Sequence, residues 1–200
     1  VATDAIDRLQ TTAESHRRVM IVEVMGRHVG WIAAYAGIAG GADAILVPEK
    51  VVPIEVLCRI IRDRARRKRH FSLFVVAEDA KILLGPGKIL RTPVVRDEYG
   101  DVKLGGIGEQ LATELRRRTD SEVRVTVLGY VQRGGTPTAF DRVLATRCGV
   151  AAVELVHQKK FGRMVVLNGN RIRSASIRRI VRRLKQLDPS LYKTAEVFFG

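Results

Sequence analysis

The segment Val19-Met20-Ile21-Val22-Glu23-Val24 decides the fold class, because it is an apolar run interrupted by a single acid. A strand with this pattern is buried on both faces, which is typical of a parallel sheet covered by helices. Helix-forming residues 31–38 follow after a glycine-containing turn, and Gly40-Gly41 ends that helix. Residues 44–48 then form a second apolar strand. The segment therefore opens a β-α-β unit.

The alternation of apolar strands and amphipathic helices continues on both sides of this unit. Apolar spacing predicts an opening helix with Ile6 and Leu9 on one face. Downstream, it predicts strands over 71–76, 124–128 and 164–167, and helices after Pro53 and over 108–118, 139–156 and 176–187. This order predicts an α/β fold with a largely parallel sheet and helices on both faces, running through residues 1–200 without a clear internal boundary.

Residues 79–105 interrupt this alternation. The stretch lacks a helical or strand period, and it carries turn signals at Gly85-Pro86-Gly87 and at residues 97–101. We expect a long excursion that includes a short hairpin, and long excursions of this kind are often functional.

The composition indicates a basic globular protein. Its 35 Lys and Arg residues against 21 Asp and Glu give a formal net charge of +14, which suits nucleic acid, an anionic surface or phosphorylated small molecules. The two cysteines, Cys58 and Cys148, lie in apolar helical patterns, so we expect buried thiols in a reducing, cytoplasmic compartment. No apolar run has the length of a membrane span, and residues 1–7 lack the order of a signal peptide, so no membrane partner is expected.

A candidate phosphate-binding loop follows the predicted strand at residues 124–128. It reads Gly129-Tyr130-Val131-Gln132-Arg133-Gly134-Gly135-Thr136-Pro137, and it places an arginine beside two glycines at the carboxyl end of a strand. Open α/β sheets bind ligands at this end of their strands. The alternative is a tight strand-to-helix turn with Arg133 in solvent.

Two further arginines flank the strand at residues 19–24. Arg27 follows Gly26, which lets the backbone approach a ligand, and a guanidinium offers bidentate hydrogen bonds to phosphate. Arg18 precedes the strand and lies roughly 20 Å from Arg27 at ~3.3 Å per residue, too far to share one phosphate within a chain. The two could meet only across a subunit contact, and the alternative for Arg18 is a solvated charge.

Two acids, Glu78 and Asp79, end the strand at residues 71–76. A carboxylate there can accept hydrogen bonds from sugar hydroxyls or approach a metal, and the alternative is a helix cap or loop acid. A metal site is weakly supported, because no His or Cys lies at ligand spacing. Together with Arg124 near the start of its strand, these residues suit a phosphorylated polyol.

Four motifs, in this order, resemble the phosphofructokinase family. They are Val22-Glu23-Val24-Met25-Gly26-Arg27-His28-Val29-Gly30-Trp31, Ala39-Gly40-Gly41-Ala42 leading to Val47-Pro48-Glu49, Val76-Ala77-Glu78, and Val127 through Pro137 with Asp141-Arg142. The resemblance implies phosphoryl transfer to the 1-hydroxyl of fructose 6-phosphate. It implies Mg²⁺ with ATP or pyrophosphate as the donor, and the metal ligands of the family do not lie in this chain.

The resemblance also implies roles for single residues. The turn Met25-Gly26-Arg27 would hold the sugar phosphate, and Arg27 would stabilise charge on the transferring group. Glu78 would bind sugar hydroxyls, and Arg133 would face the 6-phosphate. Tyr130 stands where many relatives have histidine, so it can donate a hydrogen bond to the phosphate but supplies no positive charge near neutral pH.

The counterparts of Arg18 and Arg124 reach into the neighbouring subunit's site in this family. The resemblance therefore implies a homo-oligomer, a dimer or a tetramer, with shared sugar-phosphate sites. It also accounts for the distance between Arg18 and Arg27.

The sequence departs from the family in what it lacks. It contains neither the glycine-rich nucleotide segment nor the Gly-Thr-Ile-Asp-Asn-Asp turn that carries the catalytic base. It resembles the C-terminal three-fifths of a family member, and we expect the isolated chain to be inactive.

Two other functions stay open at this point, a non-catalytic regulatory relative and a basic nucleic-acid-binding module. The second is favoured by the arginines within residues 62–69, 116–118 and 178–183. In the last of these segments the arginines lie opposite apolar residues, as on an ordinary solvated helix face. No aromatic residues are interleaved with them, which disfavours a nucleic-acid partner.

Overall fold

The computed structural model describes residues 1–92, 95–96, 102–103, 105–182 and 184–200, and it divides the chain into two compact units. Unit 1 comprises Val1–Gly134 and Gln186–Gly200, and unit 2 comprises Gly135–Lys185. The first boundary therefore falls inside the glycine pair of the candidate phosphate-binding loop. The turn expected at residues 97–101 lies outside the described residues.

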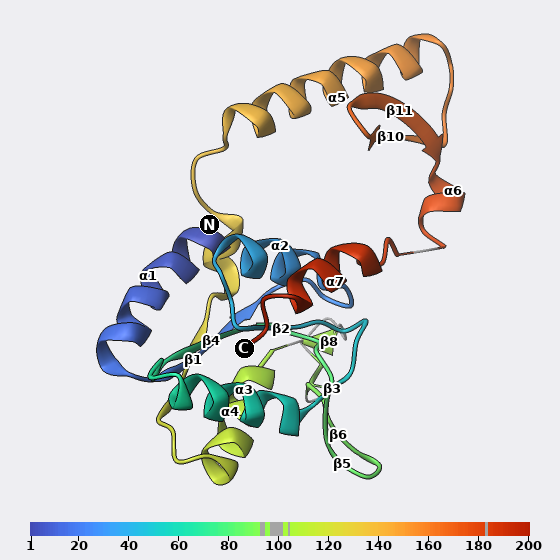
Figure 1. The fold of residues 1–200 in the computed structure, drawn as a ribbon. Helices are drawn as coiled ribbons and strands as arrows, with labels where there is room; N and C mark the ends of the chain where they lie inside the picture. Colours follow the sequence, from blue (N-terminus) through green and yellow to red (C-terminus); the bar gives the residue numbers. More distant parts are fainter. Residues whose placement is uncertain (93–94, 97–101, 104, 183) are drawn as a thin grey trace. The chain divides into compact units, whose positions relative to one another are not determined.

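A four-stranded parallel sheet forms the centre of unit 1 (Figure 1). Its strands lie in the order β2 (Ala44–Leu46), β4 (Ser72–Ala77), β1 (Val19–Val24) and β9 (Val123–Val127). All residues of β1 and β4 are buried, as expected for a parallel sheet covered on both faces. The predicted α/β fold class is confirmed.

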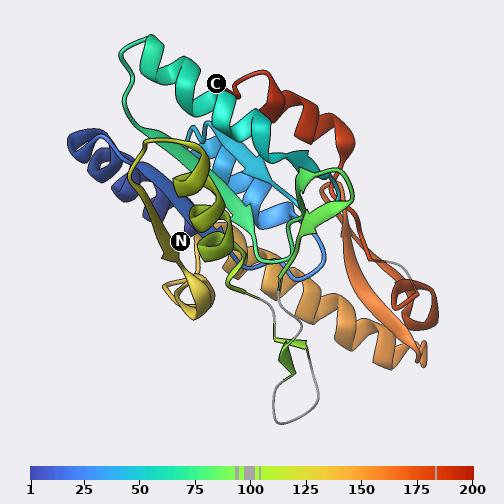
Figure 2. The same cartoon turned by 90° about the horizontal axis from the view of Figure 1, so that it is seen from below.

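Helices cover both faces of this sheet. Figure 1 shows α1 (Ala2–His16) and α2 (Trp31–Ala39) on one side, and α3 (Ile54–Arg66) and α4 (Ile107–Arg118) on the other. Figure 2, seen from below, shows α4 in front of the strands. Because side chains alternate along a strand, Val19 and Ile21 pack toward α3 and α4, whereas Met20 and Val22 pack toward α1 and α2.

Glu23, the single acid in β1, binds the backbone at the start of α4. Glu23 is only 2% exposed, and its two carboxylate oxygens each accept a backbone hydrogen bond at 2.8 Å, from Gly106 and Gly108. The first amides of a helix have no partner within the helix, and they carry partial positive charge. A buried carboxylate in an apolar strand therefore fixes the position of α4.

The segment after β4 contains the expected short hairpin. Strand β5 (Ile82–Gly85) pairs antiparallel with β6 (Lys88–Leu90) and parallel with β3 (Val52–Pro53). Two further short strands, β7 (Val95–Arg96) and β8 (Val102–Lys103), pair antiparallel with each other.

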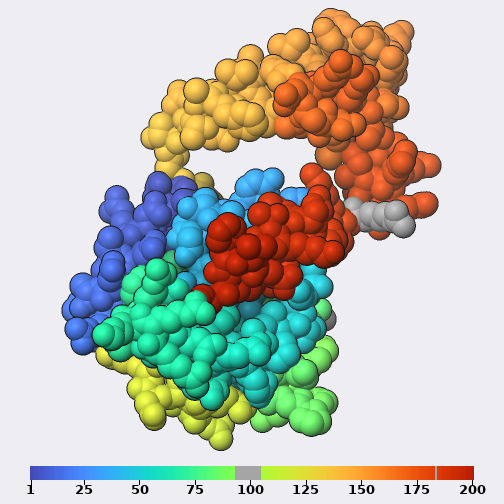
Figure 3. Space-filling view, viewed as in Figure 1, coloured from blue at the N-terminus to red at the C-terminus, as the bar shows by residue number. Residues whose placement is uncertain are grey.

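The last residues of the chain return to unit 1. Figure 3 shows α7 (Pro189–Glu196) and the segment after it on the surface beside the residues of α3. The Glu49 carboxylate joins this segment to the start of α2, because it accepts hydrogen bonds from the backbone of Leu187 at 3.0 Å and of Gly30 at 3.1 Å. The buried Tyr192 hydroxyl donates to the Ile45 carbonyl at 2.7 Å.

Unit 2 contains α5 (Ala139–His157), the antiparallel strands β10 (Arg163–Asn168) and β11 (Arg171–Ser176), and α6 (Ile177–Ile180). Figure 1 shows the hairpin along one side of α5. A reciprocal pair of hydrogen bonds between Thr138 and Asp141 caps the start of α5. The predicted helix at residues 139–156 is thus confirmed.

The helix predicted at residues 176–187 is wrong, because among the described residues of that range only Ile177–Ile180 is helical. Ser176, the first residue of that range, ends β11, a strand that the sequence did not predict. In a longer helix, Arg178 and Arg182 would lie on the same face, one turn apart. Like charges at this spacing destabilise a helix.

Candidate functional site

Three neighbouring strand ends place most of the predicted site residues at the carboxyl edge of the sheet. The backbone pairing continues one residue beyond the strands, since Glu78 N donates to Val24 O at 3.0 Å and Leu128 N donates to Glu23 O at 3.1 Å. The residues that follow β4, β1 and β9 are therefore side by side. These include the predicted site residues Met25, Gly26, Arg27, Glu78, Tyr130 and Arg133.

Glu78 binds the backbone of the turn that follows β1. It is 9% exposed, and its Oε1 accepts hydrogen bonds from the backbone nitrogens of Gly26 at 3.0 Å and Arg27 at 2.7 Å. Its Oε2 accepts no hydrogen bond from any other described residue. One oxygen thus orders the turn, and the other can receive a hydroxyl donor.

The turn itself has an unusual backbone. A side chain at Gly26 would place its Cβ 2.5 Å from the Val29 carbonyl oxygen, which explains the glycine. Arg27 has a φ of 50°, in the left-handed region that residues with a side chain rarely adopt. Such a conformation costs of order 1 kcal/mol or more, and it persists only where surrounding contacts fix it. The Arg27 side chain is exposed.

A second link joins the same two strand ends. His28 Nδ1 lies 2.9 Å from Asp79 Oδ2, within hydrogen-bond distance. The sequence left Asp79 open between a ligand for sugar hydroxyls or a metal and a helix cap or loop acid, and His28 was not predicted as a site residue. The two residues are 51 positions apart, and no local pattern pairs them.

A short 3₁₀ turn, Gly129–Arg133, follows β9. The Arg133 guanidinium carbon lies 5.5 Å from the centroid of the Tyr130 ring, and the two form a cation–π contact. Both side chains are exposed, and Tyr130 is 81% exposed. A guanidinium and a phenol hydroxyl are therefore accessible to an anion here.

Gln132 lies between these two residues and was missed by the sequence analysis. Its Oε1 accepts a hydrogen bond from the Met25 backbone nitrogen at 3.2 Å, and its Nε2 donates to the Gly129 carbonyl at 3.1 Å. Its position inside the quoted motif was the only available signal.

Arg18 and Arg124 lie at the opposite, amino edge of the sheet. Arg18 Nε is 2.7 Å and Arg124 Nη2 is 2.6 Å from the carboxylate of Glu122. The hydrogen bond from Arg18, together with that from Arg124, lowers the pKa of Glu122. The structure therefore separates these two arginines from the other predicted site residues by the length of β1, roughly 20 Å.

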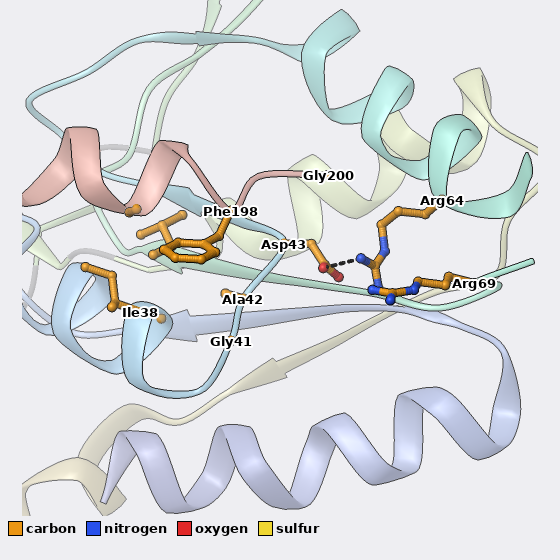
Figure 4. Close-up of a pocket in the computed structure, with 11 residues that line it drawn as sticks. Ile38, Gly41, Ala42, Asp43, Arg64, Arg69, Phe198 and Gly200 are labelled. Atoms are coloured by element: carbon orange, nitrogen blue, oxygen red, sulfur yellow. Dashed lines mark ion pairs between the residues drawn. The ribbon is translucent and has the colours of Figure 1, made fainter. Parts of the chain in front are cut away.

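Unit 1 also contains a cavity of about 550 Å³ that includes none of these site residues (Figure 4). A buried ion pair lies at its wall, with Arg64 Nη1 2.6 Å from Asp43 Oδ1. Burial raises the pKa of Asp43, against the opposing effects of the Leu73 amide and of Arg64. Arg69, from the basic loop after α3, also lines this cavity.

Several arginines that favoured a nucleic-acid partner are used within the fold. Arg64 is buried, Arg116 donates to the Val123 carbonyl at 2.7 Å, and Arg118 pairs with Glu114 at 3.0 Å. In unit 2, Arg178, Arg179 and Arg182 line an open depression with Ser176.

The described ranges contain neither a metal-binding cluster nor a membrane-spanning helix. No three His, Cys, Asp or Glu side chains are grouped there in a way that could hold a metal ion. None of the helices in those ranges is both long and apolar enough to cross a membrane.

Comparisons with known proteins agree on one family. A family model described as Phosphofructokinase matches residues 1–156. Over all 200 residues, the chain is 51% identical to a pyrophosphate–fructose 6-phosphate 1-phosphotransferase of Streptomyces coelicolor. It is 50% identical to an ATP-dependent 6-phosphofructokinase of Mycobacterium tuberculosis. The chain spans 58% of the length of each of these relatives.

Solved structures give the same result. The phosphofructokinase of Saccharomyces cerevisiae matches 98% of this chain with a TM-score of 0.74 and 32% identity, and the match covers 24% of that chain. The phosphofructokinase of Pichia pastoris in the T-state matches 98% of this chain with a TM-score of 0.69 and 32% identity, over 20% of its own chain.

Proposed function

From the premise that this chain belongs to the phosphofructokinase family, we propose that its carboxyl edge binds fructose 6-phosphate for phosphoryl transfer to the 1-hydroxyl. The observation that carries the proposal is the binding of the Met25–Arg27 turn by Glu78. A carboxylate oxygen of Glu78 thus lies beside the exposed Arg27, and the exposed Arg133 follows the neighbouring strand β9. A phosphorylated sugar needs a carboxylate to accept from its hydroxyls and arginines to bind its phosphate.

Each end of the substrate has a matching group at this edge. Glu78 Oε2 accepts from a sugar hydroxyl, while Arg133 and the Tyr130 hydroxyl bind the 6-phosphate. Arg27, together with Met25 and Gly26, forms the wall beside the 1-hydroxyl. Its guanidinium stabilises the charge that develops on the transferring group.

The proposed site is completed by a second copy of the chain in a homo-oligomer. Arg18 and Arg124 are too far from the carboxyl edge to contact the same sugar phosphate within one chain. Contributed by a neighbouring copy, they add two positive charges to the site. Their shared partner Glu122 keeps the two guanidinium groups together at the surface.

The phosphoryl donor is ATP or pyrophosphate, and Mg²⁺ accompanies it. Relatives of both donor classes are about equally similar to this chain, at 51% and 50% identity. Mg²⁺ prefers carboxylate, phosphate and water oxygens. Because the described residues offer no cluster of acids, we assign no metal ligand to this chain.

We also propose that the 200-residue chain does not transfer a phosphoryl group by itself. Transfer to an alcohol requires a base for the hydroxyl proton, and the sequence contains no Gly-Thr-Ile-Asp-Asn-Asp segment to supply it. The assay is formation of fructose 1,6-bisphosphate by the purified chain with ATP or with pyrophosphate. Product formation would show that the base lies within these residues.

Isothermal titration of the chain with fructose 6-phosphate tests the substrate. We expect saturable binding that is at least about tenfold weaker in Arg133→Ala, since a hydrogen bond to a charged group contributes about 1.5–3 kcal/mol. The exposed Arg66→Ala on α3 is the matched control and should bind as the parent does. Equal binding of fructose and fructose 6-phosphate would contradict the phosphate role. A shift of mixed-sequence DNA or RNA that persists at physiological salt would favour the nucleic-acid-binding alternative instead.

A further inference from the structure

Gln132 joins two halves of the carboxyl edge that come from different strands. Its carboxamide faces the Met25 amide after β1 and the Gly129 carbonyl after β9. Only one orientation of the amide satisfies both partners, because the Met25 nitrogen can only donate and the Gly129 oxygen can only accept. The side chain is partly buried, so water competes weakly for these bonds.

The turn after β1 is therefore held from both sides. Gln132 binds the amide of Met25 from the β9 side, and Glu78 binds the next two amides, of Gly26 and Arg27, from the β4 side. Three consecutive amides are thus fixed by two side chains. This arrangement accounts for the persistence of the left-handed Arg27 backbone.

Gln132 also directly precedes Arg133, whose guanidinium contacts the Tyr130 ring. Any displacement of Gln132 relative to Met25 would change the separation between the Met25–Arg27 turn and Arg133. A rigid spacing matters for a substrate that contacts both, because binding energy is lost when the two contacts cannot be made at once.

We propose that Gln132 is a positioning residue that holds the Met25–Arg27 turn and Arg133 at the separation required by one phosphorylated sugar. It contacts neither the sugar nor the phosphate in this role. The inference rests on the proposed function, since the ligand that spans the two halves is fructose 6-phosphate.

The test compares two ligands on the full 200-residue chain. Gln132→Met keeps the length of the side chain and removes both hydrogen bonds. We expect its affinity for fructose 6-phosphate to fall about tenfold, the effect of losing two net hydrogen bonds. The affinity for inorganic phosphate, which does not span the Met25–Arg27 turn and Arg133, should change less than about twofold. Gln158→Met, at an exposed glutamine of unit 2, is the control and should leave both affinities unchanged.

Each result decides one question. Equal fructose 6-phosphate affinity in folded Gln132→Met and in the parent would overturn the inference, and so would an equal loss for both ligands. If Gln132→Met fails to fold, Gln132→Asn replaces it. Its amide is one methylene too short to reach both partners, so its fructose 6-phosphate affinity should fall at least about threefold, and an unchanged affinity overturns the inference. If the parent itself does not bind fructose 6-phosphate, the proposed function is overturned and this role of Gln132 with it.

Discussion

The carboxylate of Glu78 lies 2.7 Å from the backbone nitrogen of Arg27, so the end of β4 fixes the strained turn at the end of β1. The same side chain is the predicted sugar ligand. Glu78 therefore has two separable contributions, one to stability through Oε1 and one to binding through Oε2.

Substitution of Glu78 should separate these contributions. Glu78→Ala leaves two amides without their acceptor and should lower the free energy of unfolding by about 1–3 kcal/mol, with fructose 6-phosphate binding lost. Glu78→Gln keeps an acceptor for the amides and should lose less than half as much stability. Urea denaturation and titration calorimetry measure the two effects, with the exposed Glu154→Ala as control. Equal stability loss in both variants would contradict the role of Oε1.

Gly26→Ala tests the backbone of the turn. The new Cβ would lie 2.5 Å from the Val29 carbonyl oxygen, so the backbone of the turn that Glu78 binds must shift. We expect a loss of about 1–3 kcal/mol in unfolding free energy and at least tenfold weaker fructose 6-phosphate binding. Gly149→Ala in α5 is the control, because its Cβ would meet nothing within 4 Å. If Gly26→Ala bound fructose 6-phosphate as the parent does, a close approach of the ligand to the backbone at this position would be excluded.

Asp43 and Arg64 form a buried ion pair, and loss of one partner should destabilise unit 1 more than loss of both. Arg64→Leu leaves a buried carboxylate without its cation and should cost about 3–5 kcal/mol of unfolding free energy. The double variant with Asp43→Leu should cost less than Arg64→Leu alone, since no charge stays unpaired. Arg66→Ala, which breaks the exposed pair with Asp63, should change stability by no more than about 1 kcal/mol. Additive effects of the two buried substitutions would contradict this coupling.

Tyr192 should make unit 1 less stable at alkaline pH. Burial raises the pKa of this phenol above its ordinary value, and the hydroxyl donates to the Ile45 carbonyl. Above pH ~10 the unfolded chain loses this proton while the folded chain keeps it, so stability falls as pH rises, by up to about 1.4 kcal/mol per pH unit. Tyr192→Phe should be less stable at neutral pH and should lack this component of the alkaline slope. Tyr35→Phe, at a ring that is 62% exposed, is the control and should keep the parent's slope.

Mixing two defective variants tests the shared site. In a dimer with shared sites, Arg124→Ala and Glu78→Gln should each bind fructose 6-phosphate poorly alone. A mixed dimer has one site in which both residues are intact, so a random mixture should recover about one quarter of the sites. Calorimetry before and after subunit exchange counts the sites. No recovery, in a mixture shown by mass to contain mixed dimers, would place Arg124 outside the substrate site.

Local periodicity determined most of the framework of unit 1. The apolar run at residues 19–24 is visible in sequence because burial on both faces leaves no polar positions except one, and that one, Glu23, binds the start of α4. The positions of Arg27, Glu78 and Arg133 at strand ends follow from the same periodicity. The prediction of a helix at residues 176–187 was wrong, because it rested on apolar spacing alone and took no account of the repulsion among the arginines of that segment.

The sequence by itself determined which residues lie at which end of the strands, because strand and helix periods are properties of neighbouring residues. Only the tertiary structure decided which side chains bind each other across those ends. Gln132 and Met25 are 107 positions apart, and His28 and Asp79 are 51 apart. Hydrogen bonds over such separations depend on strand order and register, which are set by packing of the whole sheet and have no local signature.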